Sequence, residues 1–365
     1  MMLDKAYFDD KTIEKISRMS DILQRISSID YTKDRLSLYG GTALNSLHFD
    51  GIPRLSLDID FNYRDQDTGE WWKERDRIDD VLKRILSDLE YSHDSINIQA
   101  THPLTRFTVH YMTKFSQKDS IKIEVGYMRR IPVLKGDQIK KFKHPETSQK
   151  IELKTPKSEE IFGNKFCTLI YRYKDETQMS SRDLFDVYNI SNHNFDQELF
   201  LTSLLIDSFM RPEPRIYKQD IEKMMDHVSI DEEISKLVRG RKIPKDIKKK
   251  SKEFIKKYIS LSEERYKDMI DIFFDEHRFK PQLFKNHDEL NPSIESHPSY
   301  CGIYNSWSKQ NYTLVIVFFI QTRYKISIER DQSSSFFDGS FQHTLVTFTF
   351  HRQSFNRYCI DLSKV

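Results

Sequence analysis

Three cysteines in 365 residues are too few and too scattered to form a disulfide framework. Cys167, Cys301 and Cys359 form no C-x-x-C pair, so the sequence carries no cysteine-based zinc or redox motif. Such sparse cysteine is typical of a reducing cytosol, and the acidic N-terminus lacks the apolar segment of a signal peptide. The longest apolar run, residues 314–320, is too short to span a bilayer. We therefore expect a cytoplasmic protein with no membrane partner.

A strong net charge is also absent. Lys and Arg total 58 and Asp and Glu total 56, which gives a net charge of +2, so any nucleic-acid binding must depend on local clusters. The 12 histidines show no H-x-x-x-H or H-E-x-x-H spacing, and neither G-x-S-x-G nor a Walker-type loop occurs. These absences leave zinc hydrolases, serine hydrolases and P-loop enzymes unsupported.

The strongest chemical signal lies in residues 39–63. There Ser56, Asp58 and Asp60 alternate with apolar residues, so a strand would place one hydroxyl and two carboxylates on the same face. Two carboxylates held this close repel each other, which favours a bound cation. Hard oxygen ligands suit Mg²⁺ or Mn²⁺. A salt-bridged surface or an edge strand would show the same alternation.

A Gly40-Gly41-Thr42 turn precedes this strand and is followed by a short amphipathic helix. Small residues at a helix N-terminus allow backbone N–H groups to approach a phosphate, and the helix dipole favours an anion. Alone, such a turn is common and carries no function. Its position about fifteen residues before the S-x-D-x-D pattern connects it to the carboxylates.

A third carboxylate usually completes a two-metal phosphoryl-transfer site, and Glu124 is the candidate. On a strand over residues 121–125, Glu124 would share a polar face with Lys122. An exposed Lys/Glu face of this kind is also commonplace. Glu124 gains weight only because the two aspartates need a partner.

Further charged candidates lie on two predicted helices. Lys165 lies beside the apolar stripe of a helix over residues 158–173, where it either extends to solvent or contacts a triphosphate. Asp183 and Asp186 are three residues apart and therefore neighbours on the following helix. Acidic residues near a helix start also simply offset the helix dipole.

Hydrophobic periodicity predicts an α+β fold followed by helices. We expect a domain with a mixed or antiparallel sheet over residues 1–155, a helical domain over 156–298, and a β-prone tail over 299–365. The tail is either a small β appendage or a segment not shaped by the same selection, such as an altered reading frame. The expected strands cover residues 36–39, 55–61, 95–101, 106–111 and 120–127, and the expected helices cover 11–30, 70–90, 158–173, 181–190, 197–209 and a long helix opened by Pro244.

The largest local cluster of positive charge is the segment 236–257, KLVRGRKIPKDIKKKSKEFIKK. Solvated helices often carry such runs without further function. The alternative is an electrostatic footprint for the backbone of a polynucleotide.

Taken in order, these motifs resemble the AbiEii-type nucleotidyltransferase toxins. The toxins belong to bacterial type IV toxin–antitoxin and abortive-infection systems and include the mycobacterial MenT relatives. The shared motifs run from Gly40 to Tyr188, and the helical continuation extends the resemblance to about Pro298, whereas the tail from Tyr300 has no counterpart. The motifs read GGTAL, R-x-S-x-DIDF, K-x-EV, K-F-x-x-L-x-x-R and RDLFDVY.

The resemblance implies a polymerase-β-like nucleotidyltransferase core followed by a helical bundle. It implies roles in phosphate binding for the glycine turn, in metal binding for the aspartate pair, and in catalysis for the later motifs. In this sequence those residues are Gly40, Gly41, Thr42 and Ser56 for the nucleotide phosphates, Asp58 and Asp60 for the metal, and Glu124, Lys165, Asp183 and Asp186 in the second, third and fourth motifs.

The leading hypothesis is a Mg²⁺- or Mn²⁺-dependent enzyme that moves a nucleoside monophosphate from an NTP to an acceptor hydroxyl. The 3′ end of a tRNA, lying near the basic helices, is the expected acceptor, and a cognate antitoxin is the expected partner. One alternative is nucleotidylation of a protein hydroxyl, as in AMPylation. The other is a non-catalytic nucleotide-binding module whose helical half binds a partner.

Overall fold

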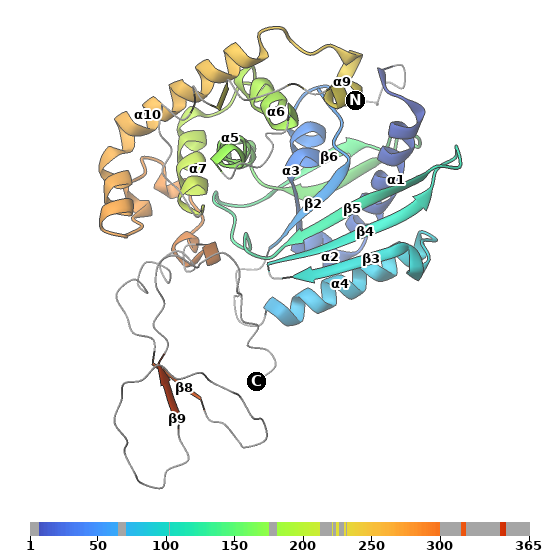
Figure 1. Cartoon of the computed structure of the whole chain (residues 1–365), viewed down its shortest axis with the longest axis horizontal. Helices are drawn as coiled ribbons and strands as arrows, with labels where there is room; N and C mark the ends of the chain where they lie inside the picture. The colour runs from blue at the N-terminus through green and yellow to red at the C-terminus, as the bar shows by residue number, and fades with distance from the viewer. Residues whose placement is uncertain are drawn as a thin grey trace, which may run out of the picture. The chain divides into compact units, whose positions relative to one another are not determined.

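A five-stranded mixed sheet is combined with helices in the first 300 residues (Figure 1), which confirms the α+β class. The strand order is β1-β2-β5-β4-β3, in which β2 and β5 are parallel and the other pairs are antiparallel. The strands are β1 (Leu36–Tyr39), β2 (Asp58–Tyr63), β3 (Ile96–Thr101), β4 (Leu104–Met112) and β5 (Lys118–Gly126). This computed structural model describes residues 7–64, 71–101, 103–174, 181–211, 221, 224–225, 230, 232–299, 315–318 and 344–347.

One face of the sheet is covered by helices and the other carries the polar side chains. Residues such as Phe107 and Ile123 are fully buried, whereas their neighbours along the strands keep exposed surface. On the covered face, α4 (Trp71–Asp88) accepts a hydrogen bond from Thr105 through Asp79 (3.2 Å), and α1 (Asp10–Ser27) bonds to β5 through Lys15 and Asp119. Asp58 and Asp60 therefore lie on the less covered face.

The glycine turn forms the helical connection between β1 and β2. A single α-helical turn, α3 (Gly40–Ala43), continues into a π-helix, η2 (Leu44–His48). A π-helix is uncommon and often marks a functional site, because its wider turn re-aims side chains. The sequence predicted a short helix here but not this widening. Upstream of β1, α2 (Asp30–Arg35) leads directly into the strand.

Sequence periodicity missed a hairpin between the sheet and the helical region. Strands β6 (Gln138–Lys143) and β7 (Lys150–Thr155) pair in antiparallel fashion, although the lysine-rich β6 has little apolar character. Tertiary contacts anchor the hairpin: buried His48 contacts the Thr155 hydroxyl (Nε2–Oγ1, 3.1 Å), and that hydroxyl donates to the Leu38 carbonyl. Burial lowers the pKa of His48 to about 3, so the imidazole is neutral.

Helices follow the hairpin, as expected. Aromatic rings of α5, α7 and α10 pack together, among them Phe166, Phe200 and Phe254. Pro244 does not lie within the first turn of the long basic helix, which begins at Ile247. The helices are α5 (Ser158–Lys174), α6 (Ser181–Ser191), α7 (Gln197–Phe209), α9 (Glu232–Leu237) and α10 (Ile247–Asp275), with short 3₁₀ segments His93–Ser95, Arg239–Arg241, Pro281–Leu283, His287–Glu289 and Ile294–Ser296.

The chain forms two compact units, residues 1–303 and residues 304–365. The expected boundary near residue 155 falls inside the first unit and stays a prediction. In the second unit the structure describes an antiparallel pair, β8 (Val315–Phe318) and β9 (Thr344–Thr347), and the rest of the predicted tail from Tyr300 lies outside the described residues. No described helix has the length and apolar character needed to cross a membrane.

Candidate active site

Gly40 brings the backbone of the turn directly against the Asp60 carboxylate. Tyr39 on β1 pairs with Asp60 on β2, so the next residue of the chain passes over the carboxylate. A Cβ on Gly40 would lie 2.0 Å from Asp60 Oδ2, and the φ of Gly40 is +67°. Both the close approach and the left-handed backbone require glycine here.

Gly40→Ala is therefore expected to lose nearly all activity and to destabilise the fold. The left-handed backbone alone costs about 1 kcal/mol for alanine, and the clash with Asp60 adds to it. Gly136→Ala is a matched control, because Gly136 has a φ of +71° with no atom within 4 Å of its added Cβ. Urea unfolding of both variants separates the two costs. Equal destabilisation would show that Gly40 serves only the turn.

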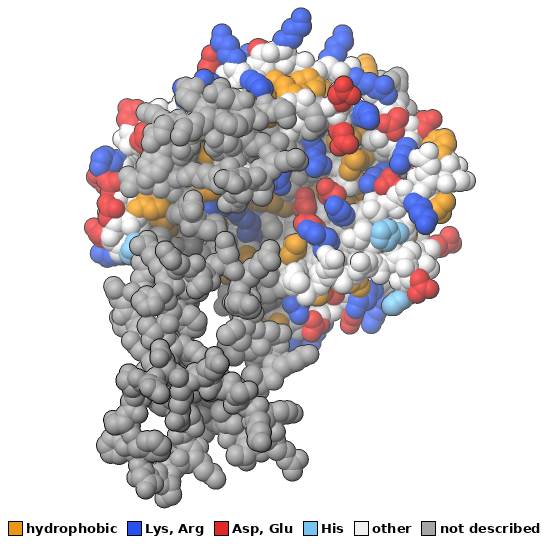
Figure 2. Space-filling model, in the orientation of Figure 1, with side chains coloured by type: hydrophobic (Ala, Val, Ile, Leu, Met, Phe, Trp, Pro, Cys, Tyr) orange, Lys and Arg blue, Asp and Glu red, His pale blue; other side chains and the backbone are white. Residues whose placement is uncertain are grey.

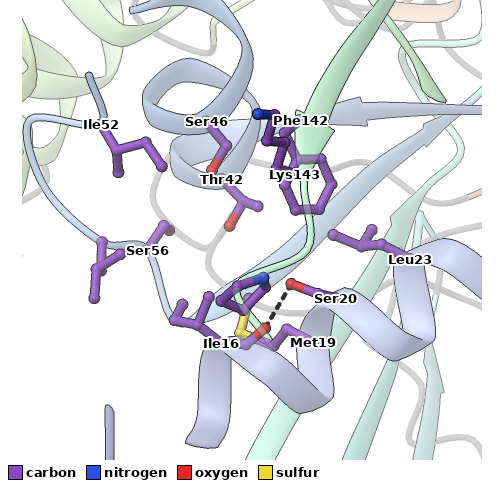
Figure 3. A pocket seen from close by; sticks show the side chains of 12 residues that line it. Ile16, Met19, Ser20, Leu23, Thr42, Ser46, Ile52, Ser56, Phe142 and Lys143 are labelled. Atoms are coloured by element: carbon purple, nitrogen blue, oxygen red, sulfur yellow. Dashed lines mark hydrogen bonds between the residues drawn. The ribbon is translucent and has the colours of Figure 1, made fainter. Parts of the chain in front are cut away.

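Thr42 and Ser56 support the turn from its other side. The Thr42 hydroxyl donates to the backbone carbonyl of Asp58 and so ties the helix to the start of β2. Ser56 lies before β2 rather than on it, with its Oγ 2.7 Å from the position of a Cβ on Gly41. Both side chains line a pocket between α1, the helical turn α3–η2 and the β6–β7 hairpin (Figure 3). Ile16 and Phe142 also line this pocket.

Three carboxylates lie on adjacent positions of two parallel strands. Asp60 on β2 is directly opposite Glu124 on β5, and Asp58 precedes it on the same face. The pKa of Asp60 is raised to about 6, chiefly by burial and in smaller part by the charges of Glu124 and Asp58, while the charge of Lys165 lowers it. The sequence thus located Glu124 beside the aspartate pair, and the opposing effect of Lys165 places that lysine within electrostatic reach.

Lys165 does not extend into solvent. Its side chain is 11% exposed, and its Nζ lies 3.5 Å from Asp183 and 3.3 Å from Asp186. Arg172, from the next turns of α5, also pairs with Asp183. The two aspartates of α6 therefore hold the lysine of α5 in place beside the strand carboxylates. Which of the two aspartates is essential stays open, since both contact Lys165.

Arg54 is a site residue to which the sequence assigned no role. Its guanidinium binds Asp186 through two bonds (Nε–Oδ1, 2.7 Å; Nη2–Oδ2, 2.6 Å), and both side chains are almost completely buried. Asn45 joins them by donating to Asp186 (3.2 Å) and to the Gly41 carbonyl (3.0 Å). Although burial alone would raise it, the pKa of Asp186 is lowered by the charges of Arg54 and Lys165.

The segment that carries Arg54 is held from outside the sheet. Leu55 donates its N–H to the Leu237 carbonyl (2.8 Å), and Arg239 donates its N–H to the Pro53 carbonyl (3.0 Å). The Arg54–Asp186 pair spans 132 positions in the sequence, so no local pattern reveals it. The only signal was the place of Arg54 in the R-x-S-x-DIDF motif.

A second arginine holds Glu124. Arg106 on β4 lies directly opposite Glu124 on β5 and donates to it (Nε–Oε1, 2.6 Å). The two side chains are 40% and 26% exposed, so this pair faces solvent in part. Arg106 thereby offsets one of the three negative charges and fixes the orientation of Glu124. Predicting this contact requires the strand register, which the sequence does not give.

The carboxylates fit a divalent cation that takes the remainder of its ligands from a substrate. Among the described residues, no group of three or more His, Cys, Asp or Glu side chains is arranged to hold a metal alone. Magnesium commonly binds one or two carboxylates together with water and phosphate oxygens. Burial and the repulsion from Glu124 and Asp58 both disfavour the ionised form of Asp60, and a bound cation would relieve both.

The family described as "Nucleotidyl transferase AbiEii toxin, Type IV TA system" matches residues 21–279. Among solved structures, MenT4, a nucleotidyltransferase toxin from Mycobacterium tuberculosis H37Rv, aligns over 81% of this chain and 90% of its own, with a TM-score of 0.46 and 14% sequence identity. No curated protein matches.

Proposed function

Since the chain belongs to the AbiEii family of nucleotidyltransferase toxins from type IV toxin–antitoxin systems, we propose that it transfers a nucleoside monophosphate from an NTP to the 3′ hydroxyl of a tRNA. The observation that carries this proposal is the meeting of the Gly40 backbone with the Asp60 carboxylate. A phosphate bound at this helix start and a metal bound by this carboxylate would be adjacent, as transfer of a phosphoryl group requires.

In this proposal Asp58 and Asp60 hold Mg²⁺ or Mn²⁺. When bound, the cation neutralises the charge that develops on the triphosphate and favours in-line displacement. Gly40 and Gly41 supply backbone N–H groups to the phosphates, with Ser56 beside them. Lys165 offsets the charge on the leaving pyrophosphate, and Asp183 and Asp186 keep its ammonium group in position.

Glu124 acts on the acceptor. It lies next to Asp60 on the same face and can accept the proton of the attacking hydroxyl. The bond from the hydroxyl oxygen to the α-phosphorus forms as the bond to the pyrophosphate oxygen breaks, and pyrophosphate leaves. Arg106 keeps Glu124 oriented for this step.

The basic segment provides the electrostatic attraction for RNA. Lys and Arg side chains project from the surface near the start of α10 (Figure 2), and Arg241, Lys245 and Lys249 are exposed there. Such a patch binds a polynucleotide backbone without reading its sequence. We further propose that the protein acts in the cytoplasm and that a cognate antitoxin opposes it.

Incubation with each of the four α-labelled NTPs and total RNA tests the proposal. We expect one NTP to label a band of tRNA size, with release of pyrophosphate and loss of labelling when EDTA is added. Parallel reactions with total protein distinguish the acceptors: labelled protein would support the AMPylation alternative instead. Saturable NTP binding without pyrophosphate release in either reaction would indicate a non-catalytic module.

A further inference from the structure

The sheet face that carries the catalytic carboxylates extends well beyond them. Residues directly opposite each other on neighbouring strands share a face, so the register continues the two aspartate rows across β5, β4 and β3. The row of Asp58 continues through Lys122, Thr108 and Asn97, and the row of Asp60 continues through Glu124, Arg106 and Gln99.

This extension, which we call the open face, is polar and exposed. Apart from the two aspartates, every residue of the two rows can donate a hydrogen bond or carries a charge, and Asn97, Gln99 and Lys122 are exposed. The helices α1 and α4 lie on the other side of the sheet (Figure 1). Figure 2 shows charged and polar side chains interspersed over β3–β5, with few hydrophobic ones. The open face is therefore solvated surface that begins at the reacting groups.

Lys122 is the cation best placed for a ligand on this face. It lies directly opposite Asp58, yet within the described part of the chain it forms no ion pair. Arg106, by contrast, is already paired with Glu124. A metal bound to the aspartates would leave Lys122 as an uncompensated positive charge beside the transfer site.

We propose that the last nucleotides of the RNA acceptor lie across the open face, from Glu124 towards Asn97, with Lys122 bound to a backbone phosphate. This inference rests on the proposed function and assigns its acceptor a surface. Three strand spacings separate β2 from β3, about 14 Å in all, which is room for a few nucleotides. The basic segment would then bind a more distant part of the same RNA.

The chemistry of the open face favours RNA over a protein. The centre of a protein–protein contact is usually apolar and aromatic, whereas these two rows contain no apolar side chain. Amide and hydroxyl groups such as those of Asn97, Gln99 and Thr108 can bind base edges, ribose hydroxyls and phosphates of a single strand. The rows also lack aromatic residues for base stacking, so we expect weak, salt-dependent binding with little sequence preference.

The test measures binding directly, by anisotropy of a fluorescent single-stranded RNA 12-mer with a free 3′ hydroxyl, at several salt concentrations. Lys122→Gln should weaken binding about five- to tenfold and reduce the salt slope by about 0.7, the loss of one phosphate contact. Lys83→Gln removes an exposed lysine of α4, on the other side of the sheet, and should change affinity less than twofold.

A gain of affinity cannot arise from misfolding. Thr108→Lys adds a cation to the Asp58 row and should tighten RNA binding severalfold. Ser87→Lys adds the same charge at an exposed position of α4 and should leave RNA binding unchanged. The open-face proposal would be overturned if each variant and its α4 control changed RNA affinity equally. Failure of wild type to bind the RNA would also overturn it. Transfer to RNA with unchanged KM in Lys122→Gln would overturn it while leaving the proposed function intact. A third outcome would separate the two proposals in the other direction. If wild type bound the RNA, Lys122→Gln did not, and wild type transferred no nucleotide to it, the open face would stand as an RNA surface and the proposed transfer reaction would be refuted.

Discussion

Asp60→Asn is expected to abolish nucleotide transfer while making the metal-free protein more stable at neutral pH. The amide cannot replace a carboxylate in binding a divalent cation, and losing about 4 kcal/mol of transition-state stabilisation lowers the rate about 10³-fold. Stability should rise because the variant no longer holds a carboxylate that is desolvated and repelled by Asp58 and Glu124. Labelled-NTP transfer and urea unfolding in EDTA measure the two effects.

The gain in stability has a defined pH dependence. Asp60 has a pKa of about 6 in the folded protein against an ordinary value of 3.8, so the folded state holds its proton more tightly. Wild type therefore loses stability as pH rises from about 4 to about 6, whereas Asp60→Asn does not. The variant should exceed wild type by about 1–2 kcal/mol above pH 6, after allowance for the partial exposure of Asp60.

The exposed Asp94 offers a control for the loss of one negative charge. Asp94→Asn removes one negative charge from exposed surface and should leave the unfolding free energy unchanged. A constant difference between wild type and Asp60→Asn at all pH values would show that Asp60 is not destabilised by its surroundings. Retained transfer in Asp60→Asn would rule out the proposed metal site. Asp58→Ala should likewise lose transfer without loss of fold.

Local periodicity was sufficient to predict the strands and helices that bury one of their sides. The predicted strand over residues 36–39 and the predicted helix over 197–209 have the same bounds as β1 and α7. Alternation also placed Asp58 and Asp60 on one face, since a shift of one residue would bury both carboxylates and expose Ile59. Glu124 could be proposed for the same reason, because neighbouring strands of one sheet place their polar side chains on the same face.

Contacts between segments far apart in the sequence could not be predicted from local periodicity. The position of Ser56 depends on the segment before β2, which the end of α9 holds outside the sheet. The lysine-rich β6 is a strand because β7 pairs with it, not because of its own apolar pattern. The sequence left two positions open for the Lys165 side chain, in solvent or against a triphosphate. Its ion pairs with Asp183 and Asp186 could not be predicted, because they depend on how α5 packs against α6.

Arg54→Met is expected to produce the largest loss of stability. It leaves a buried Asp186 charge that, among the described residues, keeps the cation of Lys165 and a hydrogen bond from Asn45. Breaking a buried ion pair from one side typically costs about 3–5 kcal/mol. Urea unfolding measures the loss. The double variant Arg54→Met/Asp186→Leu should lose less than the sum of the single variants, because it removes both charges together. Strict additivity would mean that the pair contributes nothing as a pair.

The pH dependence of the Arg54→Met defect distinguishes a lost charge from lost packing. The pKa of Asp186 is lowered in the folded wild type, so its ionised form stabilises the fold above pH about 4, and this contribution disappears as pH falls through the folded pKa. In Arg54→Met the carboxyl can take up a proton, which removes the unpaired charge. The difference from wild type should therefore be full at neutral pH and shrink as pH falls through the folded pKa of Asp186, first in the variant and then in wild type. A difference that stays constant with pH would assign the defect to the volume of the missing guanidinium. A shrinking difference would establish that Arg54 stabilises the fold through the charge of Asp186.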